Sequence, residues 1–476
     1  MRPERVVVVG GGITGLVAAY RCSQAGSDVV VIEPDRLGGK LQTSVVAGRP
    51  VDETADAFLL RVPWALALCH DLDIDGELIS PAERTAHVFV DGERRRLPEG
   101  HVLGVPTQLT ALAESGIVSE AGLQRVVADL ATDPLPTDPL VAGTDVAIGP
   151  YLRGRLGDEV VDHLIDPLVG GINAGDTNHL SLAAVVPQLD AAARSGDPSL
   201  IRSCAQQRER AIAAAGGPDA PVAPIFATPI GGMGRIIDTL LALMPGVDIR
   251  QGRAVTAIQT VGAGVHVLLD DGTSLDADAL IVATPGHVAG PLLGEVSPAA
   301  ASHLAAIAHA SISMLTFAFA RGDVGDVDHA SGCLVPRDQG TLATAISYAT
   351  SKWAQLRDPV AEDVILRVSA GRAGDDRHLE LDDTDLVNSV LRDLDRIIGM
   401  TGAPTEIRVG RWTNSFPQYA PGHLERMDAV EAALAGTPVR VAGMALRGVG
   451  IPACIKSAEE AASSLGATWP TRRSIT

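Results

Sequence analysis

Residues 5–35 read "RVVVVGGGITGLVAAYRCSQAGSDVVVIEPD", and the order of the patterns within them indicates the fold class. Val6 to Val9 form a continuous β-branched run, typical of a strand buried on both faces of a parallel sheet. A G-x-G-x-x-G motif follows, then an alanine-rich helical pattern to about Gln24, then a second strand that ends at Glu33. This order predicts a β-α-β dinucleotide-binding unit within an α/β protein.

The three glycines of the motif explain how such a unit binds a dinucleotide. Gly10 and Gly12 let the backbone approach a pyrophosphate, and Gly15 lies in the first turn of the helix. The pyrophosphate charge then meets free N–H groups and the positive end of the helix dipole. Glu33 is placed to accept hydrogen bonds from a ribose diol. A glycine turn in a Rossmann-like unit without this ligand is the alternative.

A second glycine pair favours FAD over NAD as the dinucleotide. The segment "DRLGGKLQTS", residues 35–44, carries Gly38 and Gly39 followed by Lys40. Flavoproteins that bind FAD in an extended form need such a loop beneath the flavin end, whereas NAD domains usually lack it. A surface hairpin is the alternative reading of this segment.

Composition excludes several classes of function. The 38 basic and 58 acidic residues give a formal net charge of −20, which disfavours nucleic acid or an anionic membrane surface as a partner. The five cysteines are scattered without a CxxC, as in a reduced cytoplasmic protein. No signal peptide and no integral membrane segment is predicted. HExxH, GxSxG and Walker motifs are missing, so no metal site is predicted.

Further strands are predicted far downstream, at residues 255–258, 265–269 and 279–283, and they indicate that the chain returns to the nucleotide domain. Residues 106–189 have a mostly helical pattern. Residues 287–404 have strand patterns and helix patterns in alternation. This arrangement predicts a second domain, which lies over a cavity. The Gly/Pro/Ala-rich segment 216–224 is the best candidate linker.

The ordered set "VVGGGITGLVAAY", "RLGGKLQT", "DPLVGGINAGDTNHLSL", "PIFATPIGGMGRI", "SKW", "RW", "PQYAPGH" and "AGMALRGVGIPACI" resembles the protoporphyrinogen/coproporphyrinogen oxidases. These enzymes are a branch of the FAD-containing monoamine-oxidase-like superfamily, and the resemblance covers essentially the whole chain. It implies a discontinuous FAD-binding Rossmann-like domain (1–75, 225–286 and 405–476), an inserted substrate-binding α+β domain (76–105 and 287–404) and an inserted helical domain (106–224).

The resemblance also implies which residues contact FAD. In such proteins the C-terminal segment returns to the cofactor, where Val449 to Ile451 offer backbone N–H groups to the flavin pyrimidine edge; a helix-capping glycine turn is the alternative. Val255 resembles the residue of the strand that holds the adenine. The implied cofactor residues are Gly10, Gly12, Ile13, Thr14, Gly15, Glu33, Gly38, Gly39, Lys40, Leu41, Asp56, Ala57, Val255, Thr284, Trp412, Gly443, Val449, Gly450 and Ile451.

The reaction implied by the resemblance is oxidation of coproporphyrinogen III to coproporphyrin III in heme biosynthesis. Flavin N5 takes the hydride, O₂ reoxidises the flavin with release of H₂O₂, and no protein residue is assigned as catalytic. The partners expected are the porphyrinogen, O₂ and other enzymes of the heme pathway, in the cytoplasm; no oligomeric state is predicted.

Substrate binding is less well defined by the sequence. An arginine that binds a substrate carboxylate in several relatives is replaced by Ala86, and "TADAF" (residues 54–58) departs from the usual glycine-containing motif. The candidate substrate residues are Arg84, His87, Lys352 and Arg372. Protoporphyrinogen IX oxidase, flavin amine oxidase and a non-catalytic FAD- or porphyrin-binding protein remain as alternatives.

Overall fold

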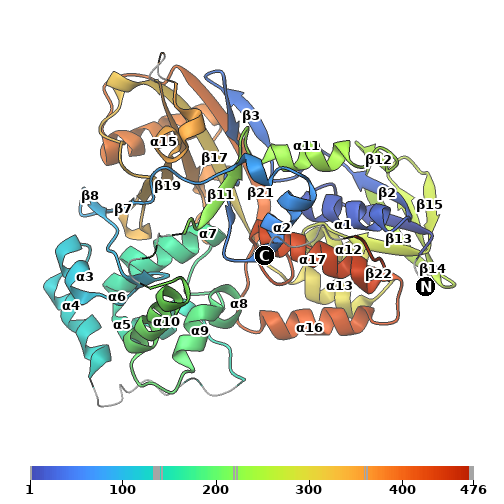
Figure 1. Cartoon of the computed structure of the whole chain (residues 1–476), viewed down its shortest axis with the longest axis horizontal. Coiled ribbons are helices and arrows are strands. Elements are labelled where there is room, and N and C mark those ends of the chain that lie inside the picture. The colour runs from blue at the N-terminus through green and yellow to red at the C-terminus, as the bar shows by residue number, and fades with distance from the viewer. Residues whose placement is uncertain are drawn as a thin grey trace. The chain divides into compact units, whose positions relative to one another are not determined.

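The computed structural model describes residues 3–470 apart from 132–139, 141–142, 218–219, 221–222, 359 and 361–362. The chain forms two compact units, labelled by element in Figure 1. The first consists of Met1–Ser80, Pro224–Ala308 and Leu424–Thr476, and the second of Pro81–Ala223 and His309–His423. The candidate linker 216–224 lies partly outside the described residues.

The first unit is built on a five-stranded parallel sheet of order β12-β2-β1-β16-β22. The strands predicted from apolar runs at residues 6–9, 29–32 and 279–283 are confirmed as β1, β2 and β16. The sheet strands are β1 (Arg5–Val9), β2 (Asp28–Glu33), β12 (Asp248–Gln251), β16 (Ala279–Val282) and β22 (Val439–Val441).

Both faces of this sheet are buried because helices and a smaller sheet cover it. Val6 and Val8 pack with α1 and α17 on one face of the sheet. Val7 and Val9 lie on the opposite face, in the cluster that contains α12, α13 and the smaller sheet, as the two-residue period of a strand requires. Figure 1 shows α1, near the start of the chain, beside α17, near its end. The helices of the unit are α1 (Ile13–Gln24), α2 (Pro63–Asp71), η1 (Asp75–Glu77), α11 (Gly234–Ala242), α12 (Gly286–Leu292), α13 (Pro298–Ala305), α16 (His423–Leu434), which starts in the second unit, and α17 (Ile451–Ser464).

Smaller antiparallel sheets complete the first unit. The strands predicted at residues 255–258 and 265–269 are confirmed as β13 and β14, which form one of these sheets with β15, in the order β13-β14-β15. The strands are β3 (Thr43–Val46), β4 (Arg49–Asp52), β5 (Phe58–Leu59), β6 (Leu78–Ile79), β11 (Phe226–Pro229), β13 (Val255–Val261), β14 (Gly264–Leu269) and β15 (Ser274–Ala277).

The second unit is built on a seven-stranded sheet of order β21-β17-β20-β19-β18-β7-β8. One face packs against the amphipathic helix α15 (Asp383–Ile398), through Phe317 and Phe319 of β17 and Leu386 of the helix. The strands are β7 (Ala86–Val90), β8 (Glu93–Arg96), β17 (His309–Ala320), β18 (Gly332–Leu334), β19 (Ala343–Tyr348), β20 (Asp363–Ala370) and β21 (Glu406–Pro417), with a separate pair β9 (His101–Val102) and β10 (Val105–Pro106).

The helical pattern predicted at residues 106–189 is confirmed within the same unit, around its own hydrophobic cluster. A π-helix, η3, interrupts the α-helices there and contains Pro167, which cannot donate the usual backbone hydrogen bond. The helices are α3 (Leu109–Ser115), α4 (Glu120–Val127), η2 (Ala128–Leu130), α5 (Ile148–Leu156), α6 (Asp158–Val160), η3 (Val161–Gly170), α7 (Gly171–Asn173), α8 (Leu182–Val185), α9 (Pro187–Ala193), α10 (Leu200–Ala214), η4 (Arg321–Asp323), η5 (Arg337–Gln339), α14 (Ala349–Lys352), η6 (Ala354–Leu356) and η7 (Arg377–Leu379).

Two boundaries differ from the sequence-based division. Residues 287–308, expected in the substrate-binding domain, belong to the first unit because α12 and α13 pack on the parallel sheet. Residues 405–423, expected in the FAD-binding domain, belong to the second unit because β21 pairs with β17 along almost its whole length. Both differences arise from contacts between distant parts of the chain, which local periodicity does not encode.

Candidate dinucleotide-binding site

The first glycine-rich loop connects β1 to α1 with very close backbone packing. Gly10 has a φ of +108°, and its N–H donates to the Ile32 carbonyl at 2.8 Å. A Cβ on Gly15 would lie 1.8 Å from the Gly10 carbonyl oxygen, so only glycine allows the helix to start here. The loop is therefore fixed by its two outer glycines.

Gly12 differs from these two because it faces open space. It is the N-cap of α1 with an extended backbone, no side chain caps the helix, and a Cβ there would meet nothing within 4 Å. The first turn of α1 contains no acidic residue that could satisfy its N–H groups. An anion placed at this end would meet both the N–H groups and the helix dipole.

Glu33 closes one side of the loop from the end of β2. Its carboxylate accepts hydrogen bonds from Gly11 N at 2.6 Å and from Asp35 N at 2.9 Å. A Cβ on Gly11 would lie 2.8 Å from the Glu33 Cβ, so this third glycine is required for the contact, and sequence reasoning missed it. Two backbone bonds orient the carboxylate and leave lone pairs for a ribose diol.

The second glycine loop lies directly against the first. Gly38 donates its N–H to the Gly11 carbonyl at 2.8 Å, and a Cβ on Gly39 would be 3.2 Å from the Gly12 Cα. Leu41 is buried in the core that α1 and α17 share. Burial lowers the pKa of the Lys40 ammonium, and the neighbouring Cys454 opposes this. The structure thus brings both predicted loops together.

Thr284 borders the same loop from the end of β16. The Thr284 Cγ2 atom lies 3.4 Å from the position of a Cβ on Gly10. Its hydroxyl oxygen is buried and has no hydrogen-bond partner in the described part of the chain. A buried hydroxyl normally has a partner, so this one is suited to a ligand oxygen.

The C-terminal segment reaches the first loop through α17. Thr14 lies close to Gly443, since its Oγ1 is 3.4 Å from the position that a Cβ on Gly443 would take. The Gly443 N–H donates to Ser457 Oγ at 3.0 Å. Burial raises the pKa of the Cys454 thiol to about 11, and a hydrogen bond with Thr14 partly offsets this. Gly450 is the N-cap of α17, again without a side-chain cap.

The remaining predicted residues of the first unit are less closely tied to the loops. Val255 begins β13, just after the turn in which Gly252 donates its N–H to the Glu33 carbonyl at 2.8 Å, so it lies near the ribose side. Asp56 and Ala57 lie between β4 and β5 and are half-buried.

Trp412 belongs to the second unit. It pairs with Ile312 across β21 and β17 in a small apolar cluster that also contains Ala174, Met314 and Phe416. Its indole Nε1 is buried and has no hydrogen-bond partner among the described residues.

The four candidate substrate residues do not form one cluster. The exposed Arg84 lies near Lys352, because the Ala82 N–H donates to the Lys352 carbonyl, at the Tyr348 end of β19. Arg372 lies two residues after Ala370, which pairs with Ala343 at the other end of β19. At about 3.3 Å per residue, the two ends of β19 are roughly 16 Å apart. His87 lies on β7, and burial followed by two nearby arginines lowers its pKa.

Together these features define a class of protein. Two glycine-capped helix N-termini, a carboxylate at the end of β2 and a second glycine loop converge in one unit, as a flavin dinucleotide requires. The open space at Gly12 and the unpartnered Thr284 hydroxyl fit this cofactor. None of the helices in the described part of the chain is both long and apolar enough to cross a bilayer.

Comparison with known proteins identifies the family. Residues 13–465 match the family of flavin containing amine oxidoreductases, so the chain belongs to this family and is an FAD-dependent oxidoreductase. It is 31% identical over 97% of both chains to a Bacillus subtilis protein named coproporphyrinogen III oxidase. It is 33% identical to a protein of that name from Mycobacterium tuberculosis (strain H37Rv), over 98% of both chains.

Solved structures agree with this assignment. A provisionally named protoporphyrinogen oxidase from Exiguobacterium sp. 255-15 superimposes with a TM-score of 0.84 at 28% identity, covering 97% of this chain and 98% of that chain. Putrescine oxidase shares the fold, with a TM-score of 0.68 at 18% identity and coverage of 98% and 99%.

Proposed function

We propose that this flavoenzyme oxidises coproporphyrinogen III to coproporphyrin III in heme biosynthesis, with O₂ as electron acceptor and H₂O₂ as co-product. The observation that carries the proposal is the 31–33% identity, over almost the full length of both chains, to proteins named coproporphyrinogen III oxidase. The site residues described above are compatible with it.

The reaction removes six hydrogens from the macrocycle, as six electrons and six protons. Three molecules of O₂ accept them and leave as three molecules of H₂O₂, so the overall equation balances. FAD, when bound, supplies the two-electron acceptor for each of the three rounds. The protein's part is to hold the cofactor, position the macrocycle and exclude water.

The residues of the first unit hold the cofactor. The N–H groups at the start of α1 would bind the pyrophosphate, and Glu33, already oriented by Gly11 and Asp35, would accept from the ribose. The N-terminus of α17, which follows Val449 and Gly450, would direct backbone N–H groups and its dipole at negative charge.

The apolar cluster of the second unit offers a surface for the macrocycle. Ile312, Met314, Trp412 and Phe416 lie on the side of β17 and β21 that does not belong to the α15 cluster. Burial of roughly 300 Å² of porphyrinogen at about 25 cal/mol/Å² would contribute about 7 kcal/mol of gross binding free energy. Apolar contact therefore supplies affinity, and charged groups set the orientation.

The test is a side-by-side assay of the FAD-loaded protein in air with coproporphyrinogen III and protoporphyrinogen IX. Porphyrin fluorescence and H₂O₂ are followed, and protein stripped of FAD is the matched control. We expect coproporphyrin to form faster than protoporphyrin, with about one H₂O₂ per two electrons. A clear preference for protoporphyrinogen IX, or rates equal to those of the stripped protein, would refute the proposal.

A further inference from the structure

The turn that follows β20 holds a cation in a fixed position. Gly371 and Gly374 both have positive φ, +90° and +80°, and the Asp375 N–H donates to the Arg372 carbonyl at 2.8 Å. His378 packs behind the turn, because a Cβ on Gly371 would lie 2.1 Å from its Nε2 atom. The turn is therefore closely packed, and Arg372 is only 7% exposed.

Arg372 is a buried cation whose charge is favoured by the nearby Asp166 and Asp375, neither of which pairs with it directly. It makes no ion pair with a carboxylate of the described residues, and its Nε has no hydrogen-bond partner there. The only hydrogen bond of its guanidinium in this part of the chain is a long one, from Nη1 to the Val335 carbonyl at 3.4 Å. Asp166 and Asp375 pair directly with Arg337 and Arg377 instead, so an anion supplied by a ligand would be favoured at the Arg372 guanidinium.

The neighbouring arginines are already paired, and they shape the surroundings of Arg372. Arg337 donates from Nε to Asp166 of η3 at 2.9 Å, and its guanidinium also donates to the Ala373 and Gly175 carbonyls. Arg377 makes two hydrogen bonds of 2.7 Å to Asp375. Burial and then Arg337 lower the pKa of Arg372 to about 10, so it is still a cation at neutral pH.

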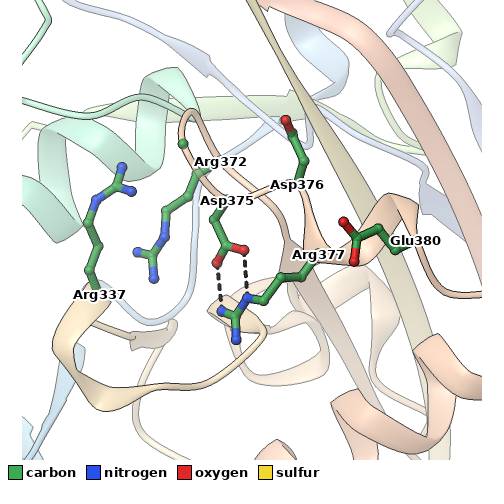
Figure 2. A pocket seen from close by; sticks show the side chains of 7 residues that line it. Arg337, Arg372, Asp375, Asp376, Arg377 and Glu380 are labelled. Atoms are coloured by element: carbon green, nitrogen blue, oxygen red, sulfur yellow. Dashed lines mark hydrogen bonds and ion pairs between the residues drawn. The ribbon is translucent and has the colours of Figure 1, made fainter.

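The three arginines and Asp375 line a cavity of about 430 Å³ (Figure 2). Figure 2 shows the Arg372 guanidinium between Arg337 and Asp375. Two further carboxylates of the lining, Asp376 and Glu380, are exposed to solvent, and Figure 2 shows Asp376 pointing away from Arg372. Exposed charges are screened, so they oppose an anion at the buried guanidinium only weakly. The buried part of the cavity is thus cationic.

The turn that carries Arg372 also contacts the apolar cluster of the second unit. Ala373, the residue after Arg372, packs against this cluster, and its N–H donates to the carbonyl of Ala174, a buried member of the cluster, at 2.8 Å. One turn therefore carries a cationic group on one residue and an apolar contact on the next. A ligand with a flat apolar body and a short carboxylate arm matches both.

We propose that this cavity is a carboxylate-binding subsite in which Arg372 pairs with one propionate of the tetrapyrrole substrate. Arg337 and its partner Asp166 act as positioning residues that hold the turn and the guanidinium in place. The inference rests on the proposed function, since it assigns a part of that substrate to this cavity.

The test compares R372Q and R372K with the wild-type holoenzyme and with R321Q, a control in which a 46%-exposed arginine of the same unit is replaced. The measured quantities are kcat and KM for coproporphyrinogen III and the Kd for coproporphyrin III. Loss of one charge-assisted pair predicts a roughly 10- to 100-fold rise in KM and Kd for R372Q. R372K, which keeps the charge but not the planar fork, should fall between R372Q and wild type.

The outcomes separate this inference from the proposed function. If wild type turns over coproporphyrinogen III and folded R372Q keeps its KM and Kd within about twofold, the subsite is wrong while the function stands. If wild type does not turn over any porphyrinogen, the proposed function itself fails. If R372Q does not fold, R372K becomes the deciding variant. An unchanged Kd and an unchanged KM in R372K would then overturn the subsite.

Discussion

Replacing Gly12 by alanine should separate cofactor binding from folding. Gly12 has φ −73° and ψ 178°, a conformation open to alanine, and the added methyl would meet no atom within 4 Å. Alanine is a poorer N-cap than glycine, so the free energy of unfolding of the FAD-free protein should fall by at most about 1 kcal/mol.

The same methyl occupies the space in which the pyrophosphate would approach the start of α1. Loss of one charge-assisted backbone hydrogen bond costs about 1.5–3 kcal/mol, which corresponds to a roughly 10- to 150-fold higher Kd for FAD. The Kd is measured by titrating FAD-free protein and following the quenching of flavin fluorescence, with urea unfolding of the same sample as the stability readout.

Gly15→Ala is the matched comparison. A Cβ there would lie 1.8 Å from the Gly10 carbonyl oxygen, so α1 must move away from β1, at a cost of about 3 kcal/mol or more. We therefore expect Gly12→Ala to lose FAD and keep its stability, and Gly15→Ala to lose both. A Kd for Gly12→Ala within about threefold of wild type, or equal destabilisation of the two variants, would refute this description of the loop.

Two further predictions concern the rest of the first unit and the thiols. Arg21→Met removes a buried guanidinium that pairs with Asp71 at 2.7 Å and Glu459 at 2.6 Å, so the free energy of unfolding in urea should fall by about 3–5 kcal/mol. The control is Arg36→Met, at a side chain that is 55% exposed, which should lower it by less than about 1 kcal/mol. Equal losses in the two variants would contradict this prediction. All five cysteines are buried, and burial raises the pKa of Cys22 to about 12, so iodoacetamide at about pH 8 should label the protein only after denaturation; rapid labelling of the folded protein would show that the thiols are accessible.

The first unit could be predicted well because its signals are local. The β-branched run before Gly10 and the alanine-rich helix after it determine β1 and α1 within one continuous stretch, and Glu33 follows the second strand directly. The return of the chain through β16 was also visible, since Ala279–Val282 is an uninterrupted apolar run.

The second unit was harder to predict because its contacts join distant residues. Nothing in the segment Glu406–Pro417 shows that it pairs with β17, and this pairing moved one domain boundary. The pair Asp166 and Arg337 is separated by 171 residues, so sequence reasoning singled out Arg372 but missed the residues that position it. Gly11 was missed for a simpler reason, because it is not one of the three glycines that define the motif.

The most direct test of the central claim is an anaerobic mixing experiment with the FAD-loaded protein and coproporphyrinogen III. We expect rapid loss of the visible absorbance of oxidised flavin, followed, when air is admitted, by its return together with coproporphyrin fluorescence and H₂O₂. Flavin absorbance that stays unchanged while the porphyrinogen is present in excess would contradict the proposed reaction and would indicate a protein that binds FAD without using it to oxidise this substrate.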